Sequence, residues 1–108
     1  MATQGLVTVK KDGRVAMKFI TGSDGMEARR LAKAIRAAGC PLSPSEGYDM
    51  ALKLGFGSDD SLVVMDAERA EFRGRGGLSP RYRATFDQAG FNPRWALGTA
   101  DYVEVIEL

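Results

Sequence analysis

Residues 5–20 read GLVTVKKDGRVAMKFI, and this stretch decides the fold. Two runs rich in apolar and β-branched residues, 5–11 and 14–20, lie on either side of Asp12-Gly13. An Asp-Gly pair adopts at little cost the two positive φ angles of a type I′ turn, which closes two-residue hairpins. Side chains alternate in character along the first run. The sequence therefore predicts a β-hairpin with one buried face.

A helical pattern follows the hairpin. Between residues 28 and 38, apolar side chains recur at intervals of three and four residues. The predicted buried face consists of Ala28, Leu31, Ala32, Ile35 and Ala38. We expect Asp24 or Ser23 to cap the first turn and Gly39 to end the helix in a left-handed conformation.

A second helix is predicted to begin at residues 43–46, which read Ser-Pro-Ser-Glu. This order combines an N-cap serine, a proline at the first helical position and a glutamate at the third. The helix extends to about Leu54, and Gly55 ends it. Its predicted core residues are Tyr48, Ala51, Leu52 and Phe56.

Four further strands are expected in the rest of the chain, at residues 61–65, 68–73, 81–86 and 102–108. Two strands, two helices and four strands, in the order ββααββββ, predict an α+β fold. In that fold a mostly antiparallel sheet carries both helices on one face. A chain of 108 residues is the size of one domain, so we expect a single domain over residues 1–108.

The composition excludes several kinds of active site. The chain has no histidine and only one cysteine, Cys40, so Ser-His-Asp and Cys-His catalysis and zinc sites built on these residues are excluded. We expect no metal site, no cofactor and no internal disulfide. No apolar run approaches the roughly 20 residues of a membrane helix, and the first residues lack a secretory signal pattern. These features predict no membrane association and a cytoplasmic location.

Charge is distributed in blocks, although the formal net charge is only +1. Residues 10–36 hold eight Lys or Arg against three acids, and residues 42–68 hold one Lys against six acids. Residues 69–83 hold five Arg against one Glu, and residues 87–108 hold one Arg against four acids. Such blocks can pair within the folded chain, pair between copies of it, or leave one basic face exposed.

The block at 69–83 is the candidate nucleic-acid-binding segment, because arginines that contact phosphates alternate there with rings that can stack on bases. Its residues are Arg69, Phe72, Arg73, Arg75, Arg81, Tyr82 and Arg83. The same pattern is also typical of a solvated strand face. Arg94 and Trp95 are candidate anchors for a partner, since Arg and Trp are common in protein interfaces. Asp24 and Trp95 are the residues that we expect near a ligand pocket, if the chain has one.

Three features lie mainly at the two ends of the chain: the opening Met-Ala-Thr-Gln-Gly-Leu, the Asp24-Gly25 pair, and Trp95 before an alternating strand. In these features the chain resembles small bacterial and phage proteins that begin Met-Gly-Thr-Arg-Gly-Leu. The resemblance implies an origin in a bacterial or mobile genetic element. It implies no activity, cofactor or site residue.

These observations lead to three hypotheses of function. The first is a non-catalytic module that binds a macromolecular partner, including a second copy of itself as a homodimer, because the alternating strand at 102–108 can offer an edge for pairing. The second is nucleic-acid binding through residues 69–83. The third is a small enzyme that uses carboxylates, or a ligand-binding domain.

Overall fold

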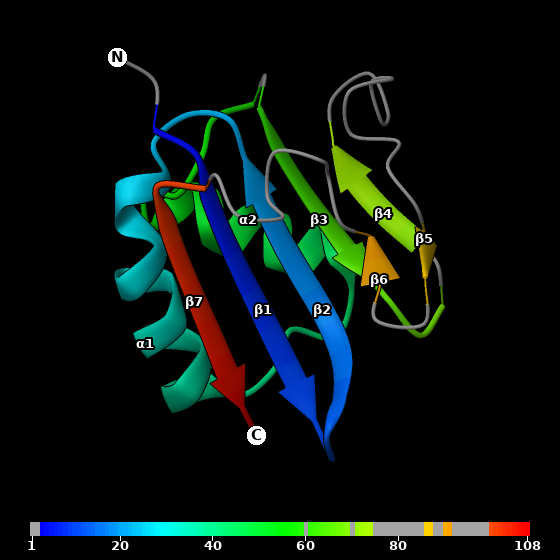
Figure 1. The fold of residues 1–108 in the computed structure, drawn as a ribbon. Helices are drawn as coiled ribbons and strands as arrows, with labels where there is room; N and C mark the ends of the chain where they lie inside the picture. The colour runs from blue at the N-terminus through cyan, green and yellow to red at the C-terminus, as the bar shows by residue number, and fades with distance from the viewer. Residues whose placement is uncertain (1–2, 60, 70, 75–85, 88–89, 92–99) are drawn as a thin grey trace.

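A computed structural model describes residues 3–59, 61–69, 71–74, 86–87, 90–91 and 100–108. The described part contains two α-helices and a sheet of five strands in the order β4-β3-β2-β1-β7 (Figure 1). The elements are, along the chain, β1 (Gly5–Lys11), β2 (Arg14–Thr21), the 3₁₀ helix η1 (Gly25–Glu27), α1 (Ala28–Ala38), α2 (Pro44–Lys53), β3 (Leu62–Asp66), β4 (Glu71–Gly74), β5 (Phe86–Asp87), β6 (Gly90–Phe91) and β7 (Tyr102–Glu107).

The predicted α+β class and the two helices on one face of the sheet are confirmed (Figure 1). The sheet is mixed, because β7 runs parallel to β1 while the other three strand pairs are antiparallel. The element order also differs from the prediction, since five described strands follow α2. Of the strand expected at 81–86, only Phe86 lies within the described residues, and it belongs to β5. No helix in the described ranges is long and apolar enough to cross a membrane.

The β1–β2 hairpin has the predicted turn. Asp12 and Gly13 have φ angles of 53° and 78°, the two positive values of a type I′ turn, and Lys11 is paired with Arg14. A bulge between Val9 and Lys10 then shifts the register. The turn type that residues 5–20 predict from local preference is therefore confirmed.

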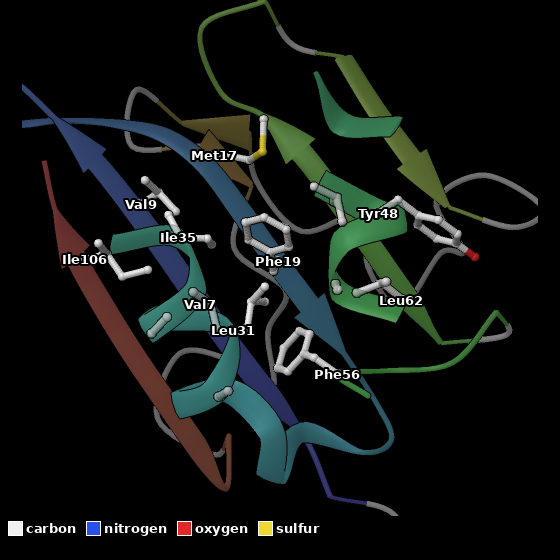
Figure 2. Close-up of a cluster of buried hydrophobic side chains, with 14 residues drawn as sticks. Val7, Val9, Met17, Phe19, Leu31, Ile35, Tyr48, Phe56, Leu62 and Ile106 are labelled. Atoms are coloured by element: carbon white, nitrogen blue, oxygen red, sulfur yellow. The ribbon is translucent and has the colours of Figure 1, made fainter. Parts of the chain in front are cut away.

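The main core lies between the sheet and the helices (Figure 2). Phe19 stands at its centre, and Leu31 and Ile35 of α1 pack on the side where Val7, Val9 and Ile106 come from the sheet (Figure 2). Each fully buried side chain of this size contributes about 1.5–3 kcal/mol by leaving water. Ala38, expected in this core, is exposed, and Leu52 is only half-buried.

The opposite face of the sheet is also buried along β1, β2 and β3, so the expectation of one buried face in the hairpin is wrong. Leu6, Ile20, Val63 and Met65 form a second cluster there. The two-stranded β5–β6 ladder lies on this side, and β6 contacts β2 and β3 (Figure 1). A strand covered on both faces places apolar residues at consecutive positions. The run Leu-Val-Val-Met at 62–65 has this composition.

The start of α1 differs from the prediction. Asp24 has a left-handed φ of 57°, its side chain caps nothing, and α1 begins only at Ala28. The reason is a close backbone crossing, in which the Gly25 N–H donates to the Thr3 carbonyl at 3.0 Å. A Cβ atom on Gly25 would lie 2.5 Å from Gly5 N, so this crossing requires glycine. By contrast, the predicted cap of α2 is confirmed, since Ser43 Oγ accepts from the Glu46 N–H at 3.2 Å.

Candidate docking surface at the edge of the sheet

Strand β7 forms one edge of the main sheet, with β1 on its inner side (Figure 1). Its start is fixed by two hydrogen bonds to Gln4: the Gln4 N–H donates to Asp101 Oδ2 at 2.8 Å, and Tyr102 N–H donates to the Gln4 carbonyl at 3.1 Å. Six consecutive residues, Gly5 to Lys10 of β1, are in register with β7. No described strand pairs with the outer side of β7, so this side is a free edge in that part of the chain.

The hydrogen-bonding groups on the free edge follow from the strand's alternation. Tyr102 N–H donates to Gln4 and Leu108 N–H donates to Lys10 at 2.8 Å, so the even-numbered residues direct their backbone groups toward β1. Successive residues of a strand point these groups to opposite sides. Val103, Val105 and Glu107 therefore direct their N–H and C=O groups outward. We call these six groups the docking edge.

Apolar side chains border the docking edge on the sheet face away from the helices. Val103 and Val105 are in register with Leu6 and Thr8 of β1, which are buried. Val103 is nevertheless 52% exposed and Val105 48% exposed. Two half-exposed valines side by side on an edge strand are the contact that a further strand would bury.

Cations border the docking edge on the helix side. Helix α1 packs on β7 and β1, whereas α2 packs on β2, β3 and β4. Glu27, immediately before α1, faces the far end of α2, since a Cβ on Gly55 would lie 3.6 Å from Glu27 Cγ. In Figure 1, α1 lies beside β7 on the side away from β1, which is the free side of the strand. Helical periodicity places Arg29, Lys33 and Arg36 on that side.

We call Arg29, Lys33 and Arg36 the basic flank. All three side chains are exposed, and none makes an ion pair with a described residue. They share an open surface hollow with Met26, Glu27 and Arg30. Glu104 of β7, half-buried, is in register with Val7 and so lies on the same side of the sheet. Together with Arg30, the basic flank gives four cations against the carboxylates of Glu27 and Glu104, so this border of the edge is positive.

The structure separates the described members of the predicted nucleic-acid segment. Arg69 lies in a turn, 3.9 Å from Asp66 Oδ2, and Arg73 stacks over the Tyr48 ring at 4.8 Å from its centroid. Phe72, 42% exposed, is in register with Met65 and lies on the other face of β4 from Arg73. Phe72 and Arg73 therefore do not form one stacking surface. Arg75, Arg81, Tyr82, Arg83, Arg94 and Trp95 lie outside the described residues.

A hydroxyl cluster that the sequence did not predict joins the end of β2 to the start of β3. Ser61 Oγ lies 2.9 Å from Thr21 Oγ1, 2.6 Å from Ser23 Oγ and 2.9 Å from Ser58 Oγ. Ser23 and Ser58 are also 3.1 Å apart. No sequence signal pairs these residues, which come from two loops about 35 positions apart. The cluster cross-links those loops.

Asp24, predicted beside a ligand pocket, is exposed on the surface near that cluster's loop, and Trp95 lies outside the described residues. Tyr48 Oη donates to Asp59 Oδ1 at 3.1 Å, which holds the loop against α2. Within the described ranges no group of three or more acids, cysteines or histidines lies close enough to hold a metal ion.

Cys40 is half-buried in a shallow pocket that also includes Lys11, Asp66 and Glu68. Burial raises the pKa of its thiol, the two carboxylates raise it further, and Lys11 opposes them. Because the thiolate is the reactive form, this environment makes the thiol a weak nucleophile.

Comparison of the chain with protein-family models, with curated proteins and with solved structures found no match. The resemblance to proteins that begin Met-Gly-Thr-Arg-Gly-Leu therefore stays a prediction.

Proposed function

We propose that this chain is a non-catalytic binding module that takes an extended segment of a macromolecular partner as an additional strand on β7. The observation that carries the proposal is the docking edge: outward N–H and C=O groups on Val103, Val105 and Glu107, beside two half-exposed valines. Edge strands with free backbone groups bind extended peptides through strand addition.

The magnitudes indicate where the affinity would come from. Six backbone hydrogen bonds, at about 1 kcal/mol net each, favour binding by about 6 kcal/mol. Fixing the backbone of about five partner residues costs roughly 5–10 kcal/mol. The two contributions nearly cancel, so backbone pairing alone gives register without tight binding. Side chains that contact Val103, Val105 and the basic flank must provide the affinity and the specificity.

A substitution at Val105 tests the proposal. Its N–H points outward, so proline at 105 removes one docking group and fills the edge with its ring, while every hydrogen bond to β1 remains. We expect peptides selected from a displayed random library on the wild-type chain to lose binding to Val105→Pro. Circular dichroism checks that the variant folds. If Val105→Pro does not fold, Val103→Pro removes the neighbouring outward N–H in the same way.

Selected peptides that bind Val105→Pro and Val103→Pro as tightly as the wild type would refute strand addition at β7. The same preparations test the homodimer. Light scattering behind a sizing column gives the mass of the chain in solution, and a monomer at high concentration would exclude a second copy as the usual partner strand.

A further inference from the structure

We infer that the segment bound at β7 belongs to another polypeptide and carries acidic side chains at alternate positions, on the side that faces α1. This inference rests on the proposed function and specifies its partner. It comes from the position of the basic flank, Arg29, Lys33 and Arg36, next to the docking edge.

The spacing of the basic flank matches an added strand. Along the helix axis, Arg29 and Lys33 are roughly 6 Å apart and Lys33 and Arg36 roughly 4.5 Å apart. An added strand lies about 4.8 Å outside β7, and its side chains on one face recur every 6.8 Å or so. Two or three successive side chains on its helix-facing side therefore extend along the three cations. Acids at positions i and i+2 of the partner would lie beside them.

The other face of the added strand has a different requirement. Its side chains would lie next to Val103 and Val105, which are about half-exposed. Burial of apolar surface favours β-branched residues at those positions. The structure therefore specifies a ligand pattern in which acidic and apolar residues alternate with a period of two.

A second copy of the chain fits this site poorly. Strands β7 of two copies would meet about 4.8 Å apart, and each brings its own α1, which packs on β7. Two helices need an axial separation of about 8–10 Å, so their outer sides would be in contact. Those sides are the two basic flanks, which places six cations together. Among the described residues, Glu104 and Glu27 of each copy would offset these cations in part, and Arg30 adds to them, so like-charge repulsion disfavours the homodimer.

Three capped peptides of equal length test the inference. In all three, valine occupies every second position, and the positions between hold glutamate, serine or lysine. Fluorescence anisotropy gives their affinities at low salt and at 0.15 M salt. Hydrogen exchange reports whether the amides of Val103, Val105 and Glu107 become protected. We expect the affinity order glutamate, serine, lysine, with a smaller spread at 0.15 M salt because these cations are exposed.

The matched variants are Lys33→Glu in the basic flank and Lys53→Glu at the end of α2. Lys53 is exposed, and α2 packs on β2, β3 and β4. We expect Lys33→Glu to weaken the glutamate peptide by about tenfold, which is an ordinary effect of reversing one charge beside a bound charge. Lys53→Glu should leave its affinity within about twofold of the wild type. Protection of the three outward amides by the glutamate peptide supports both the inference and the proposed function.

The other outcomes separate the inference from the proposed function. Equal affinity for the glutamate and serine peptides, with the outward amides protected, overturns the acidic partner and leaves strand addition standing. Binding without amide protection overturns both. A dimer with protected β7 amides in the absence of peptide makes a second copy the occupant and overturns the inference. If an oligonucleotide displaces the glutamate peptide, and Lys33→Glu weakens the binding of both equally, the basic flank binds nucleic acid. That result also overturns the inference.

Discussion

Replacing Gly25 by alanine should destabilise the fold more than an ordinary surface substitution, because the backbones of η1 and β1 touch at this residue. A Cβ on Gly25 would lie 2.5 Å from both Gln4 C and Gly5 N, which are backbone atoms and cannot rotate away. Overpacking of this kind costs about 3 kcal/mol. Loss of the hydrogen bond from Gly25 N–H to the Thr3 carbonyl adds about 1 kcal/mol. Alanine also restricts the unfolded chain more than glycine does, which offsets about 0.5 kcal/mol of this loss of stability.

The expected net loss is therefore about 3.5 kcal/mol in the free energy of unfolding, or roughly 15 °C in the midpoint of thermal unfolding. Urea denaturation followed by circular dichroism measures it. Gly13→Ala is the control: its φ is +78°, but no atom lies within 4 Å of the added Cβ, so only backbone strain of about 1 kcal/mol is expected. If the free energy of unfolding of Gly25→Ala lies within about 0.5 kcal/mol of the wild-type value, the contact of η1 with β1 does not stabilise the fold in this way.

Three further predictions concern separate parts of the fold. Phe19→Ala should cost about 3–5 kcal/mol in urea denaturation, since Phe19 is fully buried at the centre of the core; a loss under about 1 kcal/mol would contradict that placement. Ser43→Ala should cost about 1 kcal/mol through the lost cap on Glu46 N–H, with Ser45→Ala as a nearby control. Burial raises the pKa of the Cys40 thiol from its ordinary value of 9.0, so alkylation at pH 8 should be slower in the folded chain than in urea. The contribution of this thiol to stability is fully present below its pKa in the unfolded chain, and it is lost as the pH rises through its pKa in the folded chain. Equal alkylation rates in the folded and the unfolded chain would refute the raised pKa.

The parts of the fold that depend on local signals could be predicted from the sequence. Asp12-Gly13 fixes its turn by backbone preference alone, and Ser43 with Pro44 fixes the start of α2. The start of α1 was predicted wrongly, although Asp24 is a favourable cap residue, because the contact between Gly25 and Gly5 holds Asp24 in a left-handed conformation. That contact joins residues 20 positions apart, and no local pattern encodes it.

The candidate site could be predicted only in part for the same reason. The alternation in 102–108 predicts a strand, but its parallel pairing with β1 joins residues 97 positions apart. The cations of 28–38 are visible in the sequence as a charge block. Their position beside the docking edge depends on the strand order β2-β1-β7, which places α1 over the last strand. Most of the Arg69 to Arg83 segment lies outside the described residues, so its role stays a prediction.

The two edges of the main sheet differ in a way that supports selective binding at β7. Natural proteins protect edge strands by making them short, bulged or charged. Both edge strands carry charged residues, Glu71 and Arg73 in β4 and Glu104 and Glu107 in β7, but β7 has no bulge in its pairing with β1 and has two half-exposed valines. The neighbouring basic flank adds a further protection, because it repels a second basic flank and attracts acids.

One substitution should therefore have two opposite effects. Lys33→Glu creates a flank of alternating sign, in which the introduced carboxylate of one copy can pair with Arg29 or Arg36 of another. Reversing this charge should weaken the glutamate peptide and strengthen self-association, which light scattering measures on the same sample. Loss of peptide binding without any gain in mass would show that repulsion between flanks is not what keeps copies apart. A gain in mass without loss of peptide binding would show that the basic flank does not contact a peptide bound at the docking edge.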